Sequence, residues 1–177
     1  MLYFTSDTHF NHKNIINYCG RPYGSVKEMN EAIIENWNNL ITPDDEVYHL
    51  GDIGFGNYKD VIKCISQLNG KIHLIKGNHD HTNLVKDLLN QNLIMSCDLY
   101  KMINIEGYDL FMCHFPMYSW TNKERGSYML HGHLHTLNDT LSITPDHYDV
   151  GVDKNGMKPV SFEQVIELIK TQNEFHL

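Results

Sequence analysis

The segment KIHLIKGNHD at residues 71–80 decides the fold, because it joins an apolar run directly to a polar turn. Its first half is typical of a short buried β-strand over residues 71–76. Gly77 permits an abrupt exit from that strand, since it has no side chain. Asn78 and His79 follow at once, where a strand end offers neither of them an obvious packing role. The segment therefore predicts a strand that delivers polar side chains to a ligand.

Four further clusters repeat this arrangement, each after a strand-like run. Leu2 to Thr5 precedes the first cluster, and Glu46 to Leu50 precedes the second. The runs 110–113 and 128–131 precede the last two. Together the five clusters hold eight side chains able to bind a metal: Asp7, His9, Asp52, Asn78, His79, His114, His133 and His135.

The segments between the clusters predict an α/β protein. A capping box at Ser25–Glu28 opens a long helix with one apolar face, and helices are expected at about 58–68 and 83–89. A second capping box at Ser161–Gln164 opens a C-terminal helix. Further strands are expected at residues 99–105, 110–113, 128–131, 141–144 and 148–152. This order indicates two packed sheets with helices outside them, in one domain over residues 1–177.

Composition narrows the function. The 177 residues carry a formal net charge of -8, are 41% hydrophobic and 20% charged, and include only two arginines, Arg21 and Arg125. Without a basic run, a large nucleic-acid partner and a nuclease role are both disfavoured. The four cysteines form no C-x-x-C pair, which indicates free thiols in a reducing compartment. No secretory leader or membrane-length apolar stretch is evident, so we expect a cytoplasmic protein.

The residue types in the clusters suit two neighbouring divalent cations. Carboxylate oxygens and neutral imidazoles bind such metals, and one carboxylate can bridge them. Asp52 is the natural bridge, because Gly51 allows a tight turn before it. Asp7 and His9 can reach one metal together, and the pair His133–His135 has the same i, i+2 spacing. Such ligands tolerate Mn, Fe, Zn or Ni.

Each cluster also has a purely structural explanation. An Asp-x-His pair is common, Gly-Asp is usually a turn, and a single histidine such as His114 is usually a hydrogen-bonded core residue. Small glycine turns with flanking histidines also occur without a metal. The order and separation of all five clusters disfavour this explanation for the set as a whole.

The blocks Asp7-x-His9, Gly51-Asp52, Gly77–Asp80, His114 and Gly132-His133-x-His135 resemble those of the calcineurin-like metallophosphoesterases, above all the short members from bacteria and phages. The resemblance implies a four-layer α/β/β/α sandwich of two mixed sheets around a dinuclear centre. It implies that one metal is held by Asp7, His9, Asp52 and His135, and the other by Asp52, Asn78, His114 and His133. It further implies that His79 is no ligand but lies beside the leaving group.

The expected activity is hydrolysis of phosphodiesters, with phosphomonoesters as weaker candidates. Two metals can activate a bridging hydroxide for in-line attack, and His79 is the candidate general acid. Asp52 and Asn78 complete the catalytic set, and Asn78 is also a substrate-binding candidate. Asp80 either orients His79 or caps the following helix. The competing hypothesis is a non-catalytic scaffold that binds metal and a partner on the same fold.

The chain departs from the protein-phosphatase branch of this family. No Asp-Arg-Gly follows Gly51-Asp52, so the guanidinium that would grip a phosphate is missing. Arg21 and Arg125 are the candidate substitutes. The expected substrate is a small phosphoester, nucleotide-like or a short oligonucleotide.

Several aromatic residues outside the blocks leave alternatives open. His12 either lines the pocket or starts a helix, with the helix favoured, whereas His49 and His73 are expected to be packed, hydrogen-bonded histidines. Tyr118 and Trp120 either stack on a base or pack in the protein.

Overall fold

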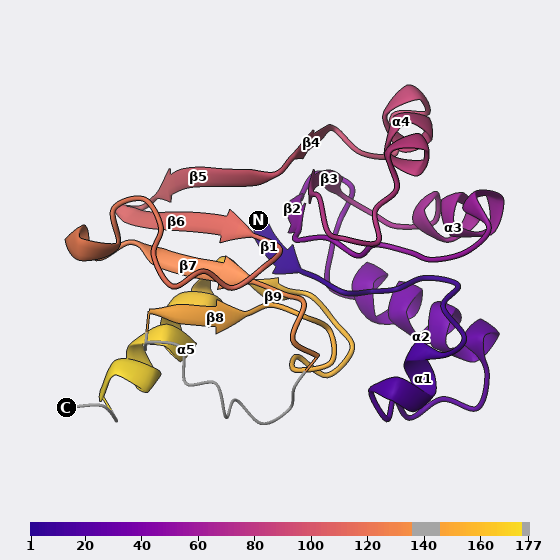
Figure 1. The fold of residues 1–177 in the computed structure, drawn as a ribbon, viewed down its shortest axis with the longest axis horizontal. Helices are drawn as coiled ribbons and strands as arrows, with labels where there is room; N and C mark the ends of the chain where they lie inside the picture. Colours follow the sequence, from indigo (N-terminus) through magenta and orange to yellow (C-terminus); the bar gives the residue numbers. More distant parts are fainter. Residues whose placement is uncertain (136–145, 175–177) are drawn as a thin grey trace.

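Two mixed β-sheets pack against each other in the computed structural model, which describes residues 1–135 and 146–174 (Figure 1). Helices cover the first sheet, and a C-terminal helix lies at the other end of the molecule (Figure 1). The predicted α/β class with two packed sheets is confirmed.

The first sheet has the strand order β4-β3-β2-β1-β9. Strands β1 to β4 are parallel, and β9 runs antiparallel to β1. β4 and β9 were not expected from the sequence, because strands of three and two residues are too short to show an alternating pattern. The strands are β1 (Leu2–Thr5), β2 (Glu46–His49), β3 (Lys71–Ile75), β4 (Ser96–Asp98) and β9 (Val160–Ser161).

The second sheet has the order β5-β6-β7-β8. β5 and β6 form an antiparallel hairpin, whereas β6, β7 and β8 are parallel and their arrowheads point to the same side (Figure 1). The expected strand at 141–144 lies outside the described residues. The strands are β5 (Tyr100–Ile105), β6 (Tyr108–Cys113), β7 (Tyr128–His131) and β8 (His147–Asp149).

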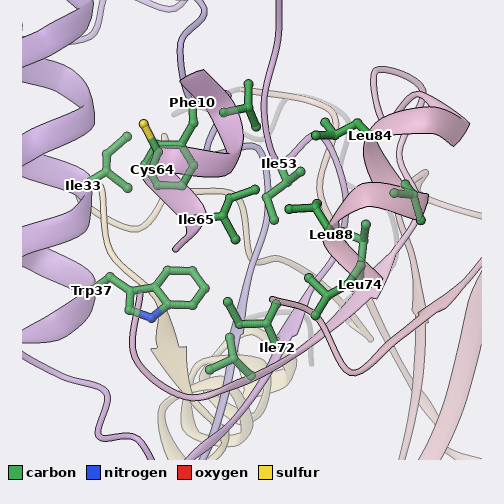
Figure 2. Packing of buried hydrophobic residues seen from close by; sticks show 14 of the residues in the cluster. Phe10, Ile33, Trp37, Ile53, Cys64, Ile65, Ile72, Leu74, Leu84 and Leu88 are labelled. Atoms are coloured by element: carbon green, nitrogen blue, oxygen red, sulfur yellow. The ribbon is translucent and has the colours of Figure 1, made fainter. Parts of the chain in front are cut away.

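Four helices lie over the outer face of the first sheet (Figure 1): α1 (Ile15–Tyr18), α2 (Val26–Asn38), α3 (Tyr58–Ile65) and α4 (Thr82–Asn90). Figure 2 shows their apolar side chains meeting those of the strands, with Trp37 of α2 facing Ile65 and Ile72. The Trp37 indole is fully buried and donates a hydrogen bond of 2.9 Å to the carbonyl of Asn69. The buried polar group is therefore satisfied, which makes this a stable platform for the loops above it.

Of the two predicted capping boxes, that at Ser161–Gln164 is complete, whereas at Ser25–Glu28 the Glu28 side chain accepts from the Gly24 N–H in place of the Ser25 N–H. The Ser25 hydroxyl accepts a hydrogen bond of 3.1 Å from the backbone N–H of Glu28 at the start of α2. The Ser161 hydroxyl accepts from the Gln164 N–H, and the Gln164 side chain accepts from the Ser161 N–H, at 3.3 and 3.0 Å. Helix α5 (Phe162–Glu174), which begins there, inserts its apolar side into the core between the sheets, near β1, β8 and β9.

This topology brings the polar clusters to one edge. The carboxyl ends of β1, β2 and β3 share one edge of the first sheet, and those of β6 and β7 share one edge of the second. A parallel bridge between Ser6 and Gly151, and a hydrogen bond of 3.0 Å from the Gly132 N–H to the His114 carbonyl, join the loops there. Within the described ranges, no helix combines the length and apolarity that a membrane crossing requires.

Candidate metal centre

The loops after β1, β2, β6 and β7 bring two groups of metal-binding side chains together. Within each group, the candidate ligand atoms lie within 4.8 Å of one another. Residues more than 120 positions apart in the chain therefore share a single site. The first group is Asp7, His9 and His135, and the second is Asp52, His114 and His133.

Asp52 lies between the two groups. Its Oδ2 is 3.6 Å from Nε2 of His9 and 3.5 Å from Nε2 of His114. Its other oxygen, Oδ1, accepts a hydrogen bond of 2.8 Å from the backbone N–H of His79. One carboxylate oxygen thus faces both groups, the position that a bridging ligand takes.

The candidate ligand atoms face one another closely, an arrangement that suits bound cations better than direct contacts between the ligands. Nε2 of His9 and Nε2 of His135 face each other at 3.3 Å, and Nε2 of His114 lies 2.9 Å from Oδ1 of Asn78. Oδ1 of Asp7 is buried and has no hydrogen-bond partner among the described residues, while its Oδ2 accepts from the His133 N–H. A buried carboxylate oxygen without a donor is costly unless a cation neutralises it. The residues present therefore fit a two-cation centre.

Several candidate ligand residues have an unusual backbone conformation. Five of them have positive φ values, a region that non-glycine residues seldom adopt and that concentrates at functional sites. Hydrogen bonds from Asp7 N to the Gly51 carbonyl (2.9 Å) and from His9 N to the Asp52 carbonyl (3.0 Å) hold the first two loops in register. The φ values are 59° for Asp7, 48° for His9, 55° for Asp52, 73° for His133 and 54° for His135.

Two glycines allow the loops to approach one another. Gly51 has a φ of +97°, and a Cβ atom there would overlap the backbone of Gly77 and the ring of His114. A Cβ atom at Gly132 would overlap the side chains of Ser6 and Asp7. Larger residues at either position would therefore separate the two halves of the site.

Two histidine rings are oriented through their outer nitrogens. Nδ1 of His114 is 2.7 Å from the Leu50 carbonyl, and Nδ1 of His135 is 2.7 Å from Oδ2 of Asp153. In each contact the Nδ1–H group donates the hydrogen bond. The lone pair of Nε2 is then free to bind a cation at the centre.

Burial sets the protonation of the ligands when no cation is bound. It lowers the pKa of His9 far below the usual range of histidine and raises the pKa of Asp7 to about 6. Burial also opposes a charge on His135, but hydrogen bonds to Asp153 and Cys19 and the nearby charge of Asp7 together outweigh it and raise the pKa to about 10. His9 is thus neutral and ready to bind a cation, whereas a cation at His135 displaces a proton.

The substrate contact predicted for Arg21 needs correction. Its guanidinium is buried and forms a two-point ion pair with Asp153, with N–O distances of 2.8 Å. Its other N–H groups donate to the carbonyls of Thr8 (3.0 Å) and Asp7 (2.7 Å) and to the sulfur of Met29 (3.5 Å). All five donors of the guanidinium are used within the protein, so Arg21 supports the loop of Asp7 from behind.

Asp153 connects this support to the centre, and this role was not predicted from the sequence. Its carboxylate holds both Arg21 and His135. A hint was present, because Asp153 comes directly after the strand-like run 148–152, much as Asp52 comes shortly after the run 46–50. Carboxylates that orient a metal-binding histidine typically change metal affinity by about 10- to 100-fold.

Asp153→Asn is accordingly expected to weaken Mn²⁺ binding by about 10- to 100-fold, because the His135 N–H loses its charged acceptor. Competition titration with a chelator measures this change. Asp87→Asn, on the exposed side of α4, is the control. An Asp153→Asn protein that binds Mn²⁺ as tightly as the control would contradict the assignment.

The substrate contact predicted for Arg125 also needs correction. Arg125 is exposed in the short 3₁₀ helix η1 (Lys123–Arg125), which precedes β7. The ligands lie beyond the opposite, carboxyl end of β7, so the length of the strand separates Arg125 from the centre (Figure 1).

Asp80 takes neither of its two expected roles. Its buried carboxylate accepts hydrogen bonds from the backbone N–H groups of Asp52 (2.8 Å), Ile53 (3.0 Å) and Gly77 (2.8 Å). The residue at the N-cap of α4 is His81, and its side chain makes no cap hydrogen bond. Asp80 thus ties the loop of the bridging Asp52 to the turn that carries Asn78.

Asp80→Ala is expected to lower the free energy of unfolding by about 3 kcal/mol, because three buried N–H groups lose a charged acceptor. Urea denaturation followed by circular dichroism measures the change. The exposed Asp87→Ala should lie within about 0.5 kcal/mol of the unmodified protein. If the two variants unfold at the same urea concentration, Asp80 does not hold the loops together.

His79 lies at the mouth of the centre. Its side chain is 40% exposed, and Nε2 is 4.0 Å from Oδ2 of Asp52. Its ring stands edge-on to Phe55, and Phe55 stacks on His12 with ring centroids 4.2 Å apart. His12 precedes α1, and its ring centroid is 5.3 Å from that of His9, so it lies beside the site in addition to preceding the helix.

The remaining aromatic residues are either packed within the protein or exposed on its surface. His49 is buried against Thr8, and His73 hydrogen-bonds Ser96 and Glu46, as expected for packed histidines. Trp120 packs with Phe111 and Met129, and its indole donates to Ser127, so the packing alternative holds for it. Tyr118 is 91% exposed.

Comparison with known proteins agrees with this geometry. The family model described as a calcineurin-like phosphoesterase superfamily domain matches residues 1–145, which include every ligand residue. The uncharacterized protein MJ1445 of Methanocaldococcus jannaschii is 36% identical over 175 residues, covering 96% of this chain and 91% of that protein. The Gene 66 protein of Mycobacterium phage L5 is 26% identical over 203 residues, covering 97% and 95%. A solved structure, the protein of unknown function AQ665 from Aquifex aeolicus, has a TM-score of 0.77 at 25% identity, covering 95% and 98%.

Proposed function

The chain belongs to the calcineurin-like phosphoesterase superfamily, and on that premise we propose that it is a phosphodiesterase that works with two divalent cations. The observation that carries the proposal is the position of Asp52, whose Oδ2 lies within 3.6 Å of a histidine nitrogen from each ligand group. The other oxygen of this carboxylate accepts the backbone N–H of His79, which leaves Oδ2 to face both groups.

Both cations would be held by side chains from the loop edge. When bound, they would stabilise negative charge on a phosphoryl group and lower the pKa of water. Asp52 would belong to both sets, and Mn, Fe, Zn and Ni all suit these donors. Asp7, His9, Asp52 and His135 would hold one cation, and Asp52, Asn78, His114 and His133 the other.

His79 is proposed as the general acid. Its backbone N–H is anchored on Oδ1 of Asp52, which keeps the residue beside the centre. Its ring is partly exposed, so it can take a proton from water between turnovers. In the reaction it would give this proton to the oxygen that leaves phosphorus, a contribution typically of about 10²–10⁴ in rate.

The charge around the centre supports a diester over a monoester. A monoester carries up to two negative charges and is usually gripped by a guanidinium. Here Arg21 has no free donor and Arg125 lies beyond the other end of β7. A diester carries a single negative charge and needs less positive charge from the protein.

Hydrolysis of bis(p-nitrophenyl) phosphate tests the proposal, with p-nitrophenyl phosphate as the monoester comparison. Protein loaded with Mn²⁺ should cleave the diester with the higher kcat/KM, and removal of the metal by EDTA should stop the reaction. Protein that carries two metal ions per chain and cleaves neither compound would refute the proposed activity.

A further inference from the structure

A groove continues from the Asn78 side of the centre along the molecular surface. It consists of two hollows, of about 370 and 430 Å³, that share Lys76, Leu99 and Phe115 in their walls. The smaller hollow includes Asn78, and the larger extends to Tyr100. The groove therefore begins at Asn78, one of the candidate ligands.

Aromatic side chains gather in the larger hollow, and Phe115 also reaches the smaller one. Phe115 is 44% exposed, and its ring centroid lies 4.9 Å from that of His114 and 4.7 Å from that of His133. Tyr100 is 63% exposed and stacks on Phe111 with centroids 5.6 Å apart. Exposed aromatic rings next to a ligand cluster offer a stacking surface for a flat, apolar group.

The charge of the groove is as informative as its shape. Among the described residues, Lys76 is the only charged one in the wall of the larger hollow, and it also lines the smaller one together with Asp80. Its amine donates to the hydroxyl of Thr82 at 3.2 Å in an exposed position. The carboxylate of Asp80 is buried and accepts three backbone N–H groups, so the ammonium group of Lys76 is the charge that the groove offers, and it favours an anion.

His79 helps to decide which part of a substrate the groove takes. Phe115 lines both hollows and Asn78 lines the smaller one, whereas the described walls of neither hollow include His79. The proposed leaving group lies beside His79. The groove is thus placed to receive the ester arm that remains on phosphorus.

We propose that this groove binds a nucleoside arm of a phosphodiester substrate, with the base on Phe115 and Tyr100 and a second phosphate of that arm near Lys76. The inference rests on the proposed function and names its substrate class: nucleotide diesters that carry an additional phosphate. A purely alkyl arm would leave both the aromatic rings and the ammonium group without a matching partner.

Three diesters that share the same leaving group, p-nitrophenolate, test the groove. They are ethyl p-nitrophenyl phosphate, thymidine 5′-(p-nitrophenyl phosphate), and the thymidine ester with an added 3′-phosphate. The thymidine ester should exceed the ethyl ester in kcat/KM by about tenfold or more, because one base gains a stacking surface. The 3′-phosphate should add a further factor of about three to ten that falls as salt concentration rises.

Substitutions in the groove should change these ratios separately. In Phe115→Leu the ratio of thymidine ester to ethyl ester should fall toward one, and in Lys76→Met the gain from the 3′-phosphate should disappear. Tyr118→Leu is the matched control, because Tyr118 belongs to the same loop as Phe115 but lies outside the walls of the groove. The Tyr118→Leu variant should leave both kcat/KM ratios unchanged.

A binding titration provides a readout independent of turnover. Calorimetry with thymidine 3′,5′-bisphosphate should show an affinity about tenfold weaker for Phe115→Leu than for Tyr118→Leu. Turnover of the ethyl ester without any preference for thymidine, or equal affinity in the two variants, would overturn the groove assignment alone. If no diester is cleaved, the proposed function fails, and this titration still decides whether the groove binds nucleotides.

Discussion

Replacing Asp52 by alanine is expected to abolish diester hydrolysis and to reduce bound metal from two ions per chain to one or none. The reason is its place between the ligand groups, with Oδ2 3.6 Å from His9 Nε2 and 3.5 Å from His114 Nε2. Loss of the shared ligand weakens both sites at once, so kcat/KM should fall by about 10³-fold or more. Metal content is measured by mass spectrometry on the dialysed protein, and turnover with bis(p-nitrophenyl) phosphate.

The exposed Asp87→Ala provides the control, because it removes one carboxylate without touching the loop edge. It should retain two metal ions and full turnover. An Asp52→Ala protein that still holds two ions would show that Asp52 bridges nothing, whatever its activity.

His79→Ala is expected to separate metal binding from catalysis. It should keep both metal ions, since Nε2 of His79 lies 4.0 Å from Oδ2 of Asp52 at the partly exposed mouth of the centre. For a substrate with an alkoxide leaving group, such as a dinucleotide, kcat should fall by about 10²–10⁴ because the leaving oxygen receives no proton. For a p-nitrophenyl ester, whose leaving group needs no proton, the loss should be about tenfold or less.

This contrast also tests the competing hypothesis of a non-catalytic scaffold. A scaffold would bind metal equally in both proteins and turn over neither substrate. The control is His73→Gln, in a histidine that hydrogen-bonds Glu46 and Ser96 within the first sheet. An equal loss with both leaving groups would argue against His79 as the acid, because a general acid matters most when the leaving group is poor.

The ligand clusters were accessible to sequence reasoning because each is local. A strand, a glycine and a polar residue lie within ten positions in the segment 71–80, and the same pattern surrounds Asp52. Parallel strands end at one edge, so clusters at strand ends are expected to meet there. The meeting of Asp7, His9 and His135, and of Asp52, His114 and His133, follows this rule.

The roles of Arg21, Asp80 and Asp153 could not be predicted, because their partners are distant in the chain or are backbone groups. Arg21 bonds Asp153 across 132 positions, and no local pattern encodes such a pair. Asp80 binds N–H groups of Asp52, Ile53 and Gly77, which every sequence possesses equally. An arginine or aspartate near a metal cluster suggests substrate or proton chemistry, yet here each serves to hold a loop.

The amino-acid order alone determined which side chains can hold cations and at which strand ends they sit, because apolar periodicity and glycine turns are short-range features. Asp52 was already the bridge predicted from the sequence, whereas only the tertiary structure decided that Arg21 is enclosed behind Asp7 and that Phe115 opens a groove from Asn78. Such features depend on how the two sheets pack and on which hydrogen-bond donors remain free once the buried polar groups are paired. Such pairings are settled by the whole fold and by no single stretch of it.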